Sequence, residues 1–170
     1  DFTINWDSQG VPSGWNLNVD TSGPMVTDSI SWNGFYEFDV VLSVPSDALA
    51  GSTATFSMSA ASNGDSSQTA SQEFTAVVDQ HYGVTLSVDS DSKENKPGED
   101  VDFIFNITNT GNGQDNYILS VSGPAVWNPV LSQNVSSINA VSVSQFTLTV
   151  SIPSDRDAGA SSGDIVVTVV

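Results

Sequence analysis

Hydrophobic and polar residues alternate along most of the chain with the period of two that is typical of half-buried β-strands. Within residues 100–108, Val101, Phe103, Phe105 and Ile107 alternate with mostly polar neighbours. The same alternation recurs in residues 2–6, 38–44, 54–60, 74–78, 117–121 and 146–152. Turn formers such as residues 63–65 and 109–113 separate these segments, and no window has sustained helical spacing. Short strands separated by turns predict an all-β sandwich or barrel.

An internal repeat sharpens this picture. Residues 38–51 and 146–159 share the pattern F-x-[VL]-x-[LV]-S-[VI]-P-S-D-x-x-A-G, 108 positions apart. It predicts a strand, a stop at a proline that has no N–H for the ladder, and a glycine with positive φ. Upstream, residues 2–6 resemble 117–121, and Trp15 resembles Trp127. We expect two tandem immunoglobulin-like β-sandwich modules, over residues 1–80 and 81–170.

The alignment of the two copies predicts that neither module is whole. The first copy has no counterpart of the opening strands in residues 84–115, and the second has none of the closing strand in residues 68–78. Unpaired sheet edges favour association, so we expect self-association there. Residues 79–83 are too few and too poor in Gly and Ser for a floppy tether, which favours a semi-rigid rod.

The charge is strongly acidic. Twenty Asp and Glu residues face only Lys93, Lys96 and Arg156, which gives a net charge of −17. Nucleic acid is excluded as a favourable partner because its phosphates need basic residues, and an anionic membrane surface is disfavoured for the same reason. Salt would screen the self-repulsion, which favours a marine or saline source; an ordinary acidic secreted protein is the alternative. No apolar run approaches the roughly 20 residues of a membrane span, so we expect no membrane insertion in this segment.

Residues 96–112 carry a P-G-[ED]-x-V turn, an alternating strand and an N-x-G-N segment. This pattern resembles the CARDB-type and NEW-type Ig-like modules of bacterial and archaeal cell-surface proteins. Trp127 and residues 153–159 also fit, and residues 1–80 join through the repeat. The resemblance implies an extracellular, cell-surface stalk, spacer, S-layer or adhesion unit, or an appendage to an enzyme, and it brings no catalytic residues. The acidic composition is similar to surface proteins of marine or halophilic archaea.

Catalysis is not expected. The single histidine, His81, lies between the two copies, and the chain has no cysteine for a thiolate nucleophile, a disulfide or a thiolate metal site. His81 borders no nucleophile-elbow pattern, and a structural role is favoured for it. Carboxylate pairs suited to glycoside hydrolysis arise freely among twenty acids, and none lies in a recognisable motif. We expect no catalytic residue.

Calcium is the one ion that the sequence favours, because it prefers carboxylate and carbonyl oxygens. Asp79, Asp89 and Asp91 lie near the junction of the two copies, where a cation would stiffen a rod. Lys93 follows closely and opposes a cation, so a solvated acidic loop is the competing interpretation. No other cofactor is expected.

Three surface positions are further candidates. Trp32 has no counterpart in the second copy and is the best candidate for an exposed, sugar-stacking aromatic, although packing is the more common role of tryptophan. Asn106 and Asn134 head the glycosylation sequons N-I-T and N-V-S. Together these features predict a non-catalytic structural or adhesion segment of a large secreted or cell-surface protein, partnered by other modules of that protein. The alternative is a carbohydrate-binding or spacer appendage of a secreted enzyme.

Overall fold

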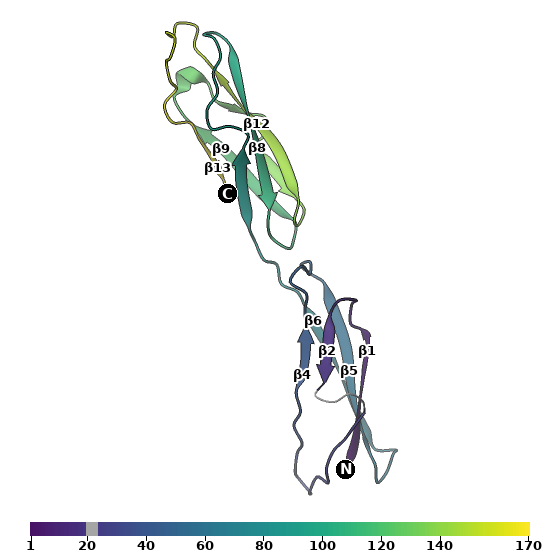
Figure 1. The fold of residues 1–170 in the computed structure, drawn as a ribbon. Coiled ribbons are helices and arrows are strands. Elements are labelled where there is room, and N and C mark those ends of the chain that lie inside the picture. The colour runs from purple at the N-terminus through teal and green to yellow at the C-terminus, as the bar shows by residue number, and fades with distance from the viewer. Residues whose placement is uncertain (20–23) are drawn as a thin grey trace. The chain divides into compact units, whose positions relative to one another are not determined.

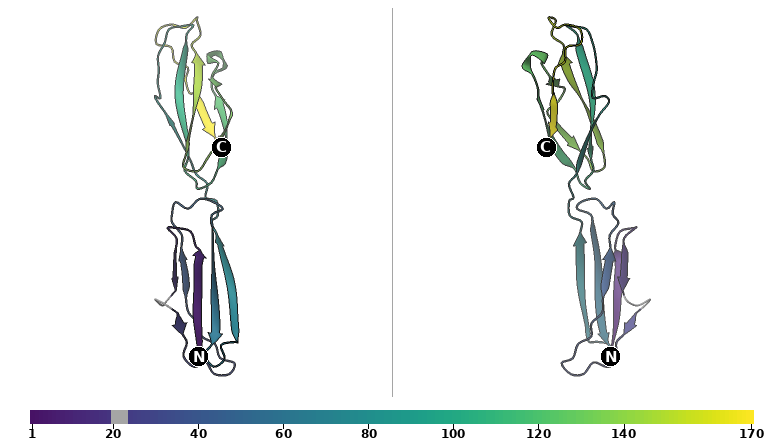
Figure 2. Two further views of the ribbon diagram at one scale, coloured as in Figure 1. Left: turned by 90° about the vertical axis from the view of Figure 1, so that its right-hand side faces the viewer. Right: turned by 60° about the vertical axis from the view of Figure 1, so that its left-hand side comes forward.

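The chain folds into β-strands, as the alternating pattern predicted. The computed structural model describes residues 1–19 and 24–170 and divides the chain into two compact units, Asp1–Asp79 and Gln80–Val170. The sequence placed the boundary one residue later. Figures 1 and 2 show the strands of each unit lying side by side along that unit.

The first unit holds two antiparallel sheets, in the orders β3-β1-β5-β6 and β2-β4. The strand bounds are β1 Phe2–Gly10, β2 Asn16–Val19, β3 Met25–Val26, β4 Val40–Ser43, β5 Thr53–Ser62 and β6 Thr69–Val77. The long strands lie where the alternation predicted them. The prediction of a strand over residues 38–44 was too long, because β4 has only the four-residue β2 as a ladder partner.

The second unit also holds two antiparallel sheets, in the orders β10-β12-β8-β7 and β11-β9-β13. The bounds are β7 Val84–Val88, β8 Asp100–Asn109, β9 Asp115–Ser122, β10 Val130–Leu131, β11 Val135–Ile138, β12 Val143–Ser151 and β13 Val166–Val169, with one 3-10 turn, η1, at Ala125–Trp127. None of the described residues belongs to a helix with the length and apolar composition that a membrane span requires.

The core of the second unit is built by both of its sheets. Ile107 and Phe146 come from one sheet, Tyr117 and Ile138 from the other, and these side chains pack together at 0–3% exposure. The rings of Phe105 and Phe146 stack with centroids 5.1 Å apart. A second group around Trp127 continues this core toward the loops. The arrangement is consistent with a β-sandwich.

One buried amide organises the end of this core. Asn109 is 1% exposed, and its Nδ2 donates to the carbonyls of Gly113 and Ile138 at 2.8 and 3.0 Å. Its Oδ1 accepts a hydrogen bond from the N–H of Gly111 at 2.8 Å. This is the first residue of the N-x-G-N segment, so the motif closes a loop and satisfies buried backbone groups.

The hydrophobic side chains of the first unit are less completely buried than those of the second. Among its described residues, four hydrophobic side chains are buried, those of Ile4, Val19, Met25 and Ala54. Phe74 of β6 stacks on Phe56 with centroids 5.3 Å apart but keeps 43% exposure. The reason is geometric: a two-stranded sheet lies opposite a four-stranded one and cannot cover all of it.

The internal repeat reappears in the strand pairing. In the first unit, β2 pairs with β4 with Val19 opposite Val40 and Asn18 opposite Val41. In the second unit, β10 pairs with β12 with Leu131 opposite Leu148 and Val130 opposite Thr149. When the two sequences are aligned so that Trp15 matches Trp127 and Phe38 matches Phe146, the residue pairs of β2–β4 coincide with those of β10–β12, with no shift in register. A one-residue slip would have inverted every side chain, so this identity is a strict test of the repeat.

The stop after each repeated strand is also the same. β4 ends at Ser43 and β12 at Ser151, each two residues before a proline. The Pro45 carbonyl accepts the N–H of Ala48 at 3.1 Å, and the Pro153 carbonyl accepts the N–H of Arg156 at 3.3 Å. The predicted strand, stop and turn are therefore present in both units.

The sheets of the two units correspond in order. In one sheet, β3, β1 and β5 of the first unit correspond to β11, β9 and β13 of the second. In the other sheet, β2 and β4 correspond to β10 and β12. Among the described residues, β7 and β8 have no counterpart in the first unit, and β6 has none in the second. β4 and β13 each keep one unpaired edge among the described residues.

Candidate functional site

The residues expected to bind calcium do not form one cluster within either unit. Asp79 is the last residue of the first unit, whereas Asp89 and Asp91 follow β7 in the second. The Asp89 carboxylate already accepts hydrogen bonds from the Lys93 ammonium and from the backbone N–H groups of Ser90 and Ile104. A cation at Asp89 would have to displace Lys93.

The hydrogen bond from Lys93 is the main reason that the pKa of Asp89 lies below its ordinary value, and the bond from the Ile104 N–H adds to it. No three acidic or histidine side chains within residues 1–19 and 24–170 are grouped so as to hold a metal ion. Calcium at Asp79, Asp89 and Asp91 stays a prediction. Calorimetric titration with CaCl2, repeated on Asp91→Asn, tests it directly.

The two sequon asparagines differ in their accessibility. Asn134 is exposed in the loop before β11. Asn106 is half-buried on β8, and its Oδ1 accepts a hydrogen bond from Gln145 Nε2 at 3.2 Å. Asn134 is thus the more open acceptor, and glycosylation at both sites stays a prediction.

Trp32 lies in a turn of the segment between β3 and β4 and is 95% exposed. The N–H of Gly34 donates to the carbonyl of Ser31 at 2.8 Å, which closes the turn around it. Phe35 in the same segment is 81% exposed. Both ring faces of an indole this exposed are open to a ligand, as stacking requires.

His81 contributes to the structure through its backbone. Its N–H donates to Asn112 Oδ1 at 2.7 Å, and its carbonyl accepts the N–H of Asn112 at 3.2 Å. These bonds tie the start of the second unit to the N-x-G-N loop. They give His81 a positioning role and assign it no chemistry.

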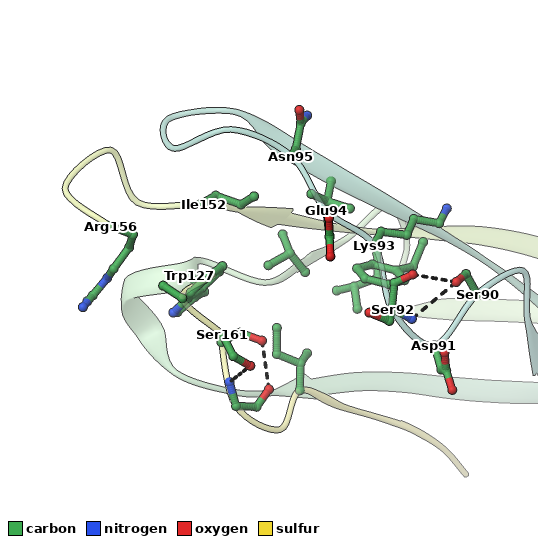
Figure 3. A pocket seen from close by; sticks show the side chains of 18 of the residues that line it. Ser90, Asp91, Ser92, Lys93, Glu94, Asn95, Trp127, Ile152, Arg156 and Ser161 are labelled. Atoms are coloured by element: carbon green, nitrogen blue, oxygen red, sulfur yellow. Dashed lines mark hydrogen bonds between the residues drawn. The ribbon is translucent and has the colours of Figure 1, made fainter. Parts of the chain in front are cut away.

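The second unit also has an open cavity of about 960 Å³, which the sequence did not predict. It lies between the two sheets, at the side where both edge strands, β7 and β13, have an unpaired edge. Its floor is apolar and includes side chains of both sheets and of η1, namely Phe103, Phe105, Trp127, Val150 and Val167, together with Ile165 just before β13. Figure 3 shows Trp127 and Ile152 on the inner side, with the loop from Ser90 to Asn95 along the rim.

Hydrogen bonds within the loops fix the rim. Ser90 Oγ donates to the Ser92 carbonyl at 2.6 Å, and the N–H of Gly163 donates to Ser161 Oγ at 3.2 Å (Figure 3). Lys93 lies 5.4 Å from the centre of the Phe103 ring, within range of a cation–π contact. Contacts within the chain therefore hold the loops of the rim in place.

All three basic residues of the chain line this cavity: Lys93, Lys96 and Arg156. Three acids also line it, Asp91, Glu94 and Asp157. The three basic and three acidic side chains bring the formal charge of the cavity wall close to zero, whereas the chain as a whole carries −17. The sequence shows that only three residues are basic. It does not show that they lie close together, because they are up to 63 positions apart and only the fold brings them to one place.

Known proteins add no assignment to these sites. Comparison of the chain with protein-family models, with curated proteins and with solved structures found no match.

Proposed function

We propose that the chain is a non-catalytic structural or adhesion segment of a large secreted or cell-surface protein, made of two Ig-like β-sandwich modules in tandem. The identical register of the Val19–Val40 and Leu131–Leu148 strand pairs carries this proposal, because two copies of one module would share it. Repeating a module that folds on its own lengthens a protein without a new fold. Such repetition suits a stalk, a spacer or an adhesive rod.

The surface chemistry supports an extracellular location. Asn134 heads an exposed sequon, and a net charge of −17 is compatible with a saline exterior that screens self-repulsion. Immunogold labelling of intact source cells with an antibody against the chain tests the proposal. We expect label outside the cell envelope, at equal density with and without permeabilisation. Label that appears only after permeabilisation would remove the cell-surface assignment.

A carbohydrate-binding appendage of a secreted enzyme is the second candidate, and the 95% exposure of Trp32 is the observation that favours it. A glycan array probed with the intact chain and with Trp32→Ala tests it. Tyr82→Ala is the matched control, because Tyr82 is another exposed aromatic, at 64%, in the other unit. Binding lost in Trp32→Ala and kept in Tyr82→Ala would support this candidate, and an array without signal for the folded chain would remove it.

A further inference from the structure

We propose that the open side of the second unit, between β7 and β13, is an acceptor groove for an added β-strand. Its occupant is a strand of the β6 type from a further copy of this repeat, which pairs with the free edge of β13 and covers the cavity. The inference rests on the proposed function in one respect, that the two units are copies of one module.

The first unit supplies the template for this pairing. Trp6 pairs with Met58 on β5, and its counterpart Val121 pairs with Val167 on β13. β13 therefore takes the place of β5. In the first unit β5 is paired along its other edge with β6, from Thr53 opposite Val77 to Ala61 opposite Thr69. The equivalent edge of β13 carries no strand among the described residues.

The free edge of β13 presents hydrogen-bonding groups in the right alternation. Val170 and Ile118 exchange both backbone hydrogen bonds, at 2.8 and 3.0 Å. In an antiparallel ladder such pairs alternate with pairs whose backbone groups point the other way. Val167 and Val169 therefore direct their N–H and C=O groups away from β9, toward the groove. A strand laid along this edge would satisfy them, as in β-augmentation.

The groove also fits the side chains of a β6-type strand. Phe74 of β6 pairs with Phe56, whose counterpart on the β13 side is Ile165. An aromatic residue at the Phe74 position would thus stand over Ile165 and face the apolar floor that includes Phe103 and Trp127. Burying one phenyl ring there is the main apolar gain of the added strand.

Charge favours the same occupant. β6 carries one charged residue, Glu73, and the rest of the chain is acidic almost throughout. The groove is lined by Lys93, Lys96 and Arg156, balanced by three acids, so it is the part of the surface where an acidic strand meets the least like-charge repulsion. A small-molecule ligand is less well supported, because the cavity is bounded by two unpaired strand edges rather than by a closed wall.

The experiment adds a synthetic peptide of residues 67–79 to the intact chain and follows amide hydrogen exchange. We expect the amides of Val167 and Val169 to slow by about tenfold or more at saturation, because both gain a partner. A peptide with Phe74→Ser, matched in length and charge, should bind roughly tenfold to a hundredfold more weakly. A scrambled peptide of the same composition should leave exchange unchanged.

Three results would overturn the proposal: no protection at Val167 and Val169, equal protection by the scrambled peptide, or protection confined to the β4 edge of the first unit. The chain variant Arg156→Glu adds a second readout, since it should weaken the peptide at low salt and approach the parent affinity at high salt. The exchange experiment is independent of where the protein resides. Loss of the cell-surface assignment would leave it standing, and its failure would leave the labelling result intact.

Discussion

Gly51 and Gly159 adopt the same left-handed backbone conformation at the same place in the two units, with φ angles of 79° and 83°. Each closes the turn that follows a repeated strand. The glycine at the end of the shared sequence pattern was predicted to have positive φ, and the structure confirms it. Open space surrounds the position where a Cβ would stand at either glycine, so only the backbone conformation disfavours a side chain.

Replacing either glycine by alanine isolates this backbone effect. We expect Gly51→Ala and Gly159→Ala to lower the free energy of unfolding by about 1–2 kcal/mol each, because an L-residue is strained at positive φ. Urea unfolding followed by circular dichroism measures it. Gly64→Ala is the control, since Gly64 lacks positive φ and has room for a Cβ. Equal losses in all three variants would contradict the explanation.

Phe38 and Phe146 occupy matching positions in the two units, and their substitution tests how far core burial differs between the units. Phe146 is 2% exposed, whereas Phe38 at the matched position is half-buried. β8 lies beside β12, whereas no strand of the described residues takes the equivalent place beside β4. We expect Phe146→Ala to cost about 3–5 kcal/mol of unfolding free energy and Phe38→Ala about 1–2 kcal/mol. Costs of similar size would mean that the first unit is as well covered as the second.

Asn109 should be the most sensitive polar position in the second unit. Asn109→Ala removes three hydrogen bonds from backbone groups of Gly111, Gly113 and Ile138, and we expect a loss of about 2–4 kcal/mol. Asn106→Ala is the control on the same strand, with an expected loss within about 1 kcal/mol. Thermal unfolding of both variants measures the difference, and a stable Asn109→Ala protein would refute the role assigned to this amide.

Acid should weaken the Asp89–Lys93 contact. Because the folded pKa of Asp89 is lowered, its contribution is present above the pKa of an unfolded aspartate, about 3.9, and is lost as pH falls through the folded value. We expect Asp89→Asn to have a lower Tm than the parent at neutral pH. The difference should vanish once pH is below the folded pKa. A constant difference at all pH values would assign the effect to packing instead of charge.

Salt should stabilise the chain as a whole. The first 92 residues contain no Lys or Arg, so like charges repel without local compensation. At about 1 M NaCl the Debye length falls to about 3 Å and this repulsion is screened. We expect Tm to rise from low salt to that concentration. An unchanged or lower Tm would show that self-repulsion is not a substantial cost in the folded state.

The sequence predicted the long strands from their alternation, and on β8 this alternation matches the burial of Val101 and Ile107. β6 alternates in the same way but stays largely exposed. It missed β2, β3, β10 and β11, since two to four residues are too few to reveal a period of two. It also missed the cavity, because Lys93 and Arg156 belong to loops that only the sheet pairing brings to one place. Among the candidate site residues, Trp32 drew attention through its lack of a counterpart, and the structure finds it exposed.

The central claim is that the two units are copies of one module, and cross-strand nuclear Overhauser effects of the intact chain test it most directly. The account predicts backbone contacts between Val19 and Val40 and between Leu131 and Leu148, in the same register. Contacts displaced by one residue in either unit, or the absence of the β2–β4 pair, would contradict it.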